Sequence, residues 1–355
     1  MSRTVFHGRF SHRARSLASL LAISVKVLFR RMIGKPLVRE WSISFEIGTL
    51  FWRAQFNRAF ALKDIADGRA YLDSLITRTA MRPAVEIRPA GEGEPRGDWF
   101  IPRERTSDIT MLYFHGGGYT FYATVTREFI ALLAHWLGVR IFAPDYRLTP
   151  EHPHPAQLED GLEAYRFLLR QGVDPSRLVV CGDSAGGHLT LMTLSKLRDA
   201  ALPQPALAIG ISPWTDTGLR GASQFGNDHY DLVQGYMTLQ FSAWLKGEGQ
   251  YENADLSPIN QSFSGVAPIY IQAGGKEILV DMIRDFAQSV QHQGGRIRLD
   301  VWEHMIHEFH GYGQEVAESS NALERIREAI AWATEPDTRE PFPAAVQTEV
   351  DQLVV

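Results

Sequence analysis

The chain has 355 residues, of which 45% are hydrophobic and 22% are charged, with 30 glycines and 18 prolines. This balance is typical of a globular protein and excludes collagen, coiled-coil and wholly disordered chains. A single cysteine, Cys181, excludes an internal disulfide and any metal site that needs several cysteines. The formal net charge of −5 gives no reason to expect a nucleic acid as partner.

The charge is unevenly distributed along the chain. Residues 1–40 hold nine basic side chains and one acidic side chain, a net charge of +8, so the rest of the chain carries −13. The apolar run 17–25 is shorter than the roughly 20 residues that span a bilayer. Lysine and arginine also follow it too closely for a secretory signal. We therefore expect a cytoplasmic protein, with peripheral membrane contact through this basic segment left open.

From about residue 84, short apolar runs alternate with helix-length stretches. The runs are short and rich in β-branched or other apolar residues, and they are predicted as strands at 111–115, 139–144, 178–182, 206–212, 268–273 and 296–302. Helices are predicted near 125–137, 156–171, 185–199, 280–293 and 317–333. This alternation predicts an α/β fold whose mostly parallel central sheet is covered by helices on both faces.

Two stretches interrupt the alternation. Residues 1–80 have a helical pattern and precede the sheet, and residues 215–255 form an aromatic-rich insert. Both are expected to build a helical cap over the carboxyl ends of the strands, where α/β proteins bind ligands. The core then comprises 81–214 and 256–333, and the proline-containing tail 334–355 is loose or strapped onto it.

The motif Gly182-Asp183-Ser184-Ala185-Gly186-Gly187 lies between a predicted strand and a predicted helix. In this strand–turn–helix context, G-x-S-x-G indicates a nucleophilic serine on a strained turn. We predict Ser184 as the nucleophile. The same sequence in isolation would also fit an ordinary glycine–serine loop.

A second motif, His115-Gly116-Gly117-Gly118-Tyr119, follows the predicted strand 111–115. Consecutive glycines present backbone N–H groups without obstruction by side chains. Such donors stabilise the negative oxygen of a tetrahedral acyl intermediate. We expect the N–H groups of Gly116, Gly117 and Ala185 to form this oxyanion hole. The sequence G-x-x-x-x-G-K-[ST] of a phosphate-binding loop is not found in the chain.

These motifs, with DYRLTPEHP at 145–153 and SPWTD at 212–216, resemble the hormone-sensitive-lipase group of α/β-hydrolases, the bacterial family IV esterases. The resemblance covers about residues 80–333. It implies an α/β-hydrolase fold and a serine carboxylesterase acting on short to medium acyl esters, with no metal or organic cofactor. It also implies substrate contacts from His115, Gly118 and Tyr119.

A serine nucleophile needs a histidine base and an acid that orients it, in the chain order serine, acid, histidine. His307 resembles the catalytic histidine of the family, although Glu308 stands where the family usually has glycine. Glu277 lies thirty residues before His307, at a position where the family usually has aspartate. Asp281 is the alternative acid, and we expect it at the start of the next helix instead.

Other readings of the same residues remain open. His304, His307 and His310 are spaced by three residues, which does not place three imidazoles on one helix face, so we expect no metal site. A non-catalytic small-molecule receptor would lose the histidine that is retained here. An amidase or acyltransferase could use the same triad. A homodimer is left open.

The basic N-terminal segment has two competing roles. Leu17, Leu20, Leu21 and Leu28 recur with helical spacing, which predicts an amphipathic helix. In one role its apolar face covers the acyl pocket and its arginines lie in water. In the other it lies in a membrane interface. The family resemblance favours the cap.

Overall fold

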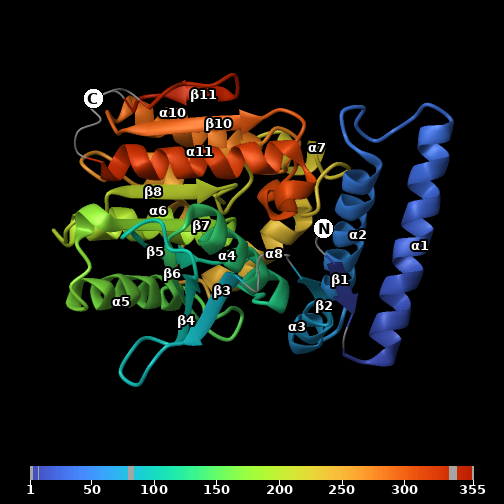
Figure 1. Cartoon of the computed structure of the whole chain (residues 1–355), viewed down its shortest axis with the longest axis horizontal. Coiled ribbons are helices and arrows are strands. Elements are labelled where there is room, and N and C mark those ends of the chain that lie inside the picture. Colours follow the sequence, from blue (N-terminus) through green and yellow to red (C-terminus); the bar gives the residue numbers. More distant parts are fainter. Residues whose placement is uncertain (1–2, 7, 79–83, 336–341, 354–355) are drawn as a thin grey trace.

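The computed structural model describes residues 3–6, 8–78, 84–335 and 342–353. At its centre is a nine-stranded sheet in the order β11-β10-β9-β8-β7-β5-β6-β4-β3 (Figure 1). The strands are β3 (Val85–Pro89), β4 (Gly97–Pro102), β5 (Thr110–Phe114), β6 (Arg140–Pro144), β7 (Leu178–Asp183), β8 (Leu207–Ile211), β9 (Ile269–Gly274), β10 (Ile297–Trp302) and β11 (Thr348–Asp351). The six adjacent strands β10, β9, β8, β7, β5 and β6 pair in parallel. The strands β3, β4 and β11 pair antiparallel at the two edges. The predicted α/β fold with a mostly parallel sheet is confirmed.

Helices cover both faces of the sheet. One layer contains α5 (Ala156–Arg170), α6 (Ala185–Asp199) and α10 (Val280–His292), and the other contains α4 (Thr124–Leu137) and α11 (Ala317–Thr334). On β7, Val180 packs into the first layer, whereas Val179 and Cys181 pack into the second. Successive side chains of a strand point to opposite faces, so a strand buried on both faces must be apolar throughout.

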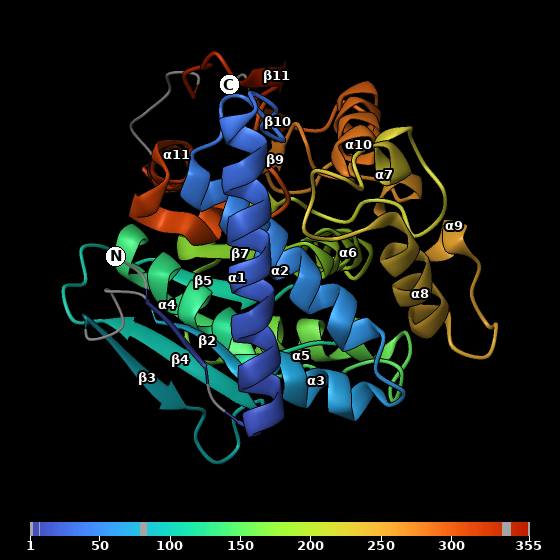
Figure 2. The ribbon, with the colours of Figure 1, turned by 90° about the vertical axis from the view of Figure 1, so that its right-hand side faces the viewer.

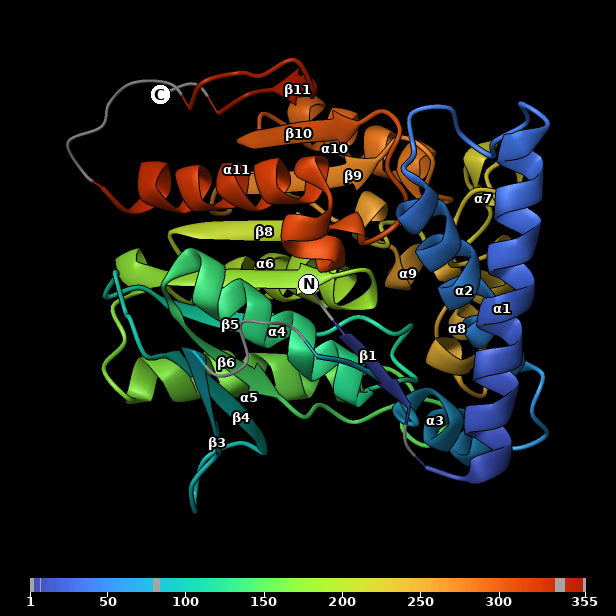
Figure 3. The same ribbon diagram turned by 45° about the vertical axis from the view of Figure 1, so that its right-hand side comes forward.

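The remaining helices gather beyond the carboxyl ends of the parallel strands (Figure 3). They are α1 (Phe10–Met32), α2 (Ile43–Phe60), α3 (Ile65–Asp73), α7 (Ser223–Gly226), α8 (Gly235–Lys246) and α9 (Asn253–Leu256). A two-stranded sheet of β1 (Arg3–Phe6) and β2 (Leu75–Arg78) accompanies them. Phe60 of α2 packs against Phe241 and Trp244 of α8, with ring centroids 5.1 and 6.0 Å apart. The N-terminal helices and the insert therefore form one aromatic-packed layer.

The orientation of α1 differs from the sequence-based expectation. Its apolar side chains were expected to face the pocket, but Leu17, Leu21 and Leu28 are more than half exposed. Leu20 alone of α1 reaches the cavity described below. Within the described residues, no helix is both long enough and apolar enough to cross a bilayer.

The C-terminal segment is tied to the sheet edge. Its strand β11 pairs with β10, and the fully buried guanidinium of Arg298 lies 2.6 Å from Asp351 Oδ1. Arg298 also lies over the ring of Phe342, 4.4 Å from its centroid. Between the two expected alternatives for the tail, residues 342–353 are therefore strapped onto the core.

Candidate active site

Ser184 lies on the turn between β7 and α6, with φ 51° and ψ −116°. A positive φ is uncommon for a residue other than glycine and is strained. The N–H of Ser184 donates to the Ile211 carbonyl (2.9 Å), and the N–H of Trp214 donates to the Ser184 carbonyl (3.0 Å). A Cβ at Gly186 would lie 1.9 Å from the carbonyl oxygen of Phe114, so this position requires glycine. The motif thus folds into a strained strand–turn–helix that leaves Ser184 half-buried.

His307 follows β10, and Glu277 follows the neighbouring strand β9. The Nδ1 atom of His307 lies 3.7 Å from Oε1 of Glu277, and both side chains are buried. The other carboxylate oxygen of Glu277 accepts hydrogen bonds from Ser212 Oγ and from the N–H of Gly274, each at 2.7 Å. These two donors fix the carboxylate so that Oε1 faces the imidazole.

Asp281 lies in a different environment, in the first turn of α10. Its carboxylate accepts a hydrogen bond from the N–H of Ser223 (2.9 Å) and lies 3.6 Å from the guanidinium of Arg284. The structure therefore brings Glu277, and not Asp281, next to the imidazole of His307.

Asp231, in the insert before α8, is a buried residue that the sequence analysis missed. Its carboxylate accepts the backbone N–H groups of His307 (3.0 Å), Ile278 (2.8 Å) and Leu232 (2.8 Å). Burial raises the pKa of Asp231 to about 7. By these bonds Asp231 joins the loop of His307 to the loop that contains Glu277.

Glu308 adopts a left-handed backbone conformation, with φ 52°. Its Oε1 lies 3.4 Å from Nε2 of His307. Burial alone would lower the pKa of His307, but the charges of Glu308 and Glu277 outweigh burial and hold that pKa well above its usual value. The described residues show no hydrogen bond between Ser184 Oγ and His307, so Nε2 faces Glu308 in this structure.

The glycine loop after β5 packs against the carboxylate of Asp183. The N–H of Gly116 donates to Asp183 Oδ2 (2.9 Å), and the hydroxyl of Tyr113 donates to Oδ1. Burial and the charge of Glu308 raise the pKa of Asp183 well above its usual value. One of the three predicted oxyanion donors is therefore engaged by a side chain. Another, the N–H of Ala185, opens α6, where helix geometry provides no acceptor.

A cavity of about 460 Å³ lies between the glycine loop and the N-terminal helices. Asp183 and Glu308, the chain neighbours of Ser184 and His307, line it, whereas Ser184 and His307 themselves do not. Most of its walls are apolar or backbone surface. They include Leu20, Ile47, Gly48, Phe51, Trp52, Phe56, Leu72, Gly116, Gly117, Phe121, Val125, Phe129 and Leu232.

The three predicted substrate-contact residues do not line this cavity. Tyr119 is buried, and its hydroxyl lies 2.6 Å from His188 Nδ1. The ring of His115 stacks between Tyr122 and Tyr146, with centroids 4.0 and 4.2 Å away, and burial lowers its pKa to about 4. A Cβ at Gly118 would lie 2.3 Å from the ring of Phe241. In the structure the side chains of His115 and Tyr119 pack within the fold, and Gly118 contacts the cap helix α8.

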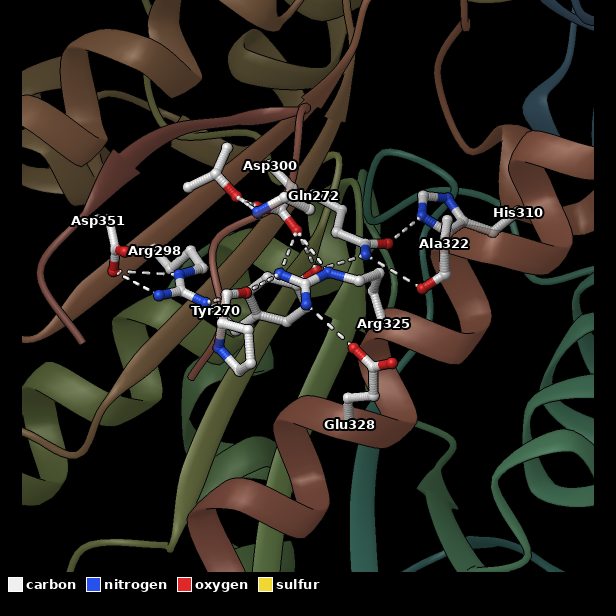
Figure 4. Close-up of polar contacts among 12 residues, drawn as sticks. Tyr270, Gln272, Arg298, Asp300, His310, Ala322, Arg325, Glu328 and Asp351 are labelled. Atoms are coloured by element: carbon white, nitrogen blue, oxygen red, sulfur yellow. Dashed lines mark hydrogen bonds and ion pairs between the residues drawn. The ribbon is translucent and has the colours of Figure 1, made fainter. Parts of the chain in front are cut away.

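His310 belongs to a buried polar network with Gln272, Tyr270 and Asp300 (Figure 4). Its Nε2 lies 2.7 Å from Gln272 Oε1, and burial lowers its pKa to about 3. Gln272 in turn donates to the hydroxyl of Tyr270, which donates to Asp300. Over the residues that the structure describes, no cluster of three or more His, Cys, Asp or Glu side chains is arranged to hold a metal ion.

Comparison with known proteins extends these observations. The chain matches a family model described as alpha/beta hydrolase fold over residues 111–311. It is 35% identical to an acetyl-hydrolase of Streptomyces hygroscopicus over 234 residues, which are 65% of this chain and 78% of that protein. It is 27% identical to an esterase of Acinetobacter venetianus over 263 residues, which are 73% and 86% of the two chains.

A solved esterase from the bacterial hormone-sensitive lipase family is similar over most of the fold. Its TM-score is 0.72 at 30% identity, covering 80% of this chain and 97% of that one. The family resemblance carried by the glycine loop and the serine motif is confirmed. The chain belongs to the α/β-hydrolase fold family, and it is an enzyme of the ester-hydrolysing branch of that family.

Proposed function

We propose that this esterase is a serine carboxylesterase in which Ser184, His307 and Glu277 form the catalytic triad. The observation that carries the proposal is the buried contact of 3.7 Å between His307 Nδ1 and Glu277 Oε1. It lies at the same sheet edge as the strained turn of Ser184, because parallel strands share one carboxyl edge.

In the first step, Ser184 Oγ forms a bond to the carbonyl carbon of the ester while His307 Nε2 takes the hydroxyl proton. The tetrahedral intermediate collapses as the bond to the alcohol oxygen breaks, and His307 returns the proton to that oxygen. Water then gives a proton to His307 and attacks the acyl carbon. The bond to Ser184 Oγ breaks as His307 returns the proton to Oγ, and the acid is released. Glu277 stabilises the imidazolium and fixes the ring tautomer throughout.

The developing oxyanion is assigned to the N–H groups of Gly117 and Ala185. The N–H of Gly116 donates to Asp183 Oδ2 at 2.9 Å, so it can join them only if this hydrogen bond breaks. Glu308 acts on the same site before substrate arrives, since it lies 3.4 Å from His307 Nε2 and favours the protonated ring. A neutral His307 is needed to accept the proton of Ser184, so we expect activity to rise with pH.

The cavity supports a neutral acyl ester as substrate. Its volume of about 460 Å³ falls within the roughly 300–1,000 Å³ of small-molecule sites. Among the described residues that line it there is neither lysine nor arginine to pair with an anionic substrate. Because α2 closes the cavity opposite the glycine loop, we propose short to medium acyl chains.

A series of p-nitrophenyl esters from acetate to palmitate tests the proposal. Ser184→Ala is expected to lose at least about 10⁴-fold in kcat, because nucleophile and base act as a unit. Ser262→Ala is the matched control, since this exposed serine lies at the opposite end of the sheet, before β9. Substantial turnover by Ser184→Ala would exclude the mechanism, and saturable binding without hydrolysis by the native chain would indicate a receptor instead.

A further inference from the structure

Helix α1 turns its serines and Arg31 toward the protein, together with the apolar side chains of Leu20 and Val27. Ser16 is fully buried, with its hydroxyl 3.4 Å from Gln55 Oε1 of α2. Ser19 lies 3.4 Å from the amide nitrogen of the same residue. Arg31 forms an ion pair of 2.7 Å with the buried Glu46. Val27 is fully buried on the same side and Leu20 lines the cavity, so polar and apolar contacts together hold α1 on the cap.

The opposite side of α1 carries a continuous apolar stripe, which we call the outer stripe. Its seven side chains are between 51% and 82% exposed: Phe10, Leu17, Leu21, Val25, Leu28, Phe29 and Met32. They make up half of the fourteen large apolar side chains that are exposed in the described part of the chain. Single exposed apolar residues are normal, whereas a contiguous patch marks an interaction site.

The outer stripe lies on the outside of the molecule. In Figures 1 and 2, α1 is the outermost element on its side, with α2 between it and the rest of the fold. The helix has 23 residues and is about 35 Å long at about 1.5 Å per residue. Its free face is thus long, straight and convex, and a flat surface fits it better than a pocket.

Exposed basic residues border the outer stripe. With about 100° of rotation per residue, Arg13 lies along one side of it, and Arg15 and Lys26 lie along the other. The first forty residues carry a net charge of +8, whereas the rest of the chain carries −13. The charged side chains that border the outer stripe on α1 are therefore positive.

We propose that α1 docks on an anionic lipid bilayer, with the outer stripe at the boundary between headgroups and acyl chains and the bordering basic residues on the headgroups. An apolar face with flanking lysine and arginine is the pattern of a helix that lies in a membrane interface. The anionic surface attracts such residues.

A second copy of the chain is a poorer occupant of this face. Two outer stripes packed together would bring two segments of charge +8 into contact, and like charges repel. A bilayer supplies both the apolar layer and the opposite charge.

Docking would also place the cavity next to the lipid. Leu20 of α1 and Ile47 and Phe51 of α2 line the cavity wall on the side of the cap. An ester dissolved in the bilayer would therefore meet the enzyme at the helix pair that closes the cavity. This consequence rests on the proposed function, whereas docking itself does not.

Cosedimentation with vesicles tests the docking without using activity. The full chain is mixed with vesicles of phosphatidylcholine, with or without about 30% phosphatidylserine. We compare Leu17→Ser/Leu21→Ser/Val25→Ser and Arg13→Gln/Arg15→Gln/Lys26→Gln with the control Leu219→Ser/Val346→Ser. The control removes two exposed apolar side chains from outside α1. Thermal melting confirms that each variant is folded.

Binding to phosphatidylserine vesicles is expected to fall at least about tenfold in both α1 variants and to stay unchanged in the control. The native chain should bind vesicles of phosphatidylcholine alone at least about tenfold more weakly. Equal binding of native chain and α1 variants would overturn the proposal. The proposal would also be overturned if the native chain did not bind vesicles but formed a dimer in sedimentation velocity, and the apolar variant were monomeric. Intact hydrolysis of soluble esters without vesicle binding would reject docking and leave the triad assignment standing.

Discussion

Replacing Glu277 with glutamine removes one charge from the proposed triad and keeps the shape of the side chain. Oε1 of Glu277 and Nδ1 of His307 are both buried without another hydrogen-bond partner, and they face each other at 3.7 Å. At this distance, and with an effective dielectric constant of about 20, a pair of unit charges interacts by about 4–5 kcal/mol. The reaction starts from the neutral ring of His307 and forms the imidazolium in the transition state, so this energy is lost from that step. It corresponds to a decrease of roughly 10³-fold in kcat.

The assay is steady-state hydrolysis of p-nitrophenyl butyrate, with kcat and KM measured separately. Asp281→Asn is the matched control, because it removes a carboxylate of the same segment that does not contact the imidazole, and its kcat should stay within about twofold of the native value. The reasoning is refuted if Glu277→Gln keeps more than about a tenth of the native kcat. If Asp281→Asn were inactive and Glu277→Gln active, Asp281 would be the acid of the triad.

Two further substitutions test the groups around the imidazole. Glu308→Gln removes a charge that raises the pKa of His307, so the acid limb of the kcat/KM profile should move to lower pH, and an unchanged or higher limb would contradict this role. Asp231→Ala leaves the buried N–H groups of His307, Ile278 and Leu232 without their acceptor. Urea titration should show a loss of about 2–4 kcal/mol in the free energy of unfolding, and no measurable loss would show that water replaces the carboxylate.

The central elements could be predicted from sequence because burial on both faces leaves an unambiguous pattern. Every residue of β7 (Leu178–Asp183) is buried, and the predicted run 178–182 coincides with it. The edge strands gave no such signal. In β3 only Val85 is buried, and β11 contains two acids among its four residues. Edge strands pair through the backbone on one side only, so their side chains are free to be polar.

The residues of the site divide in a similar way. Ser184 and the glycines were predictable, because a tight turn or a close approach of backbones leaves a local sequence pattern. Asp231 was not predictable, since it acts on the backbone N–H of His307 across 76 positions and any acceptor of the right shape would serve. Tyr119 was expected to contact the substrate. Its backbone has a positive φ of 61°, and its side chain is buried against His188.

The orientation of α1 shows what helical periodicity leaves open. An amphipathic pattern defines two faces of a helix and does not say which of them meets the protein. The orientation of α1 is determined by the neighbouring helix α2, whose buried residues include Glu46 and Gln55. Packing the exposed leucines of α1 onto α2 would remove the ion pair of Arg31 with Glu46 and the contacts of Ser16 and Ser19 with Gln55, leaving these two side chains only their bonds to Leu37, Tyr71 and Phe51. The side of α1 that carries these serines and Arg31 therefore faces the protein. The exposure of the outer stripe is thus a consequence of how the cap is built, and it leaves an apolar, positively bordered face on the outside of the molecule.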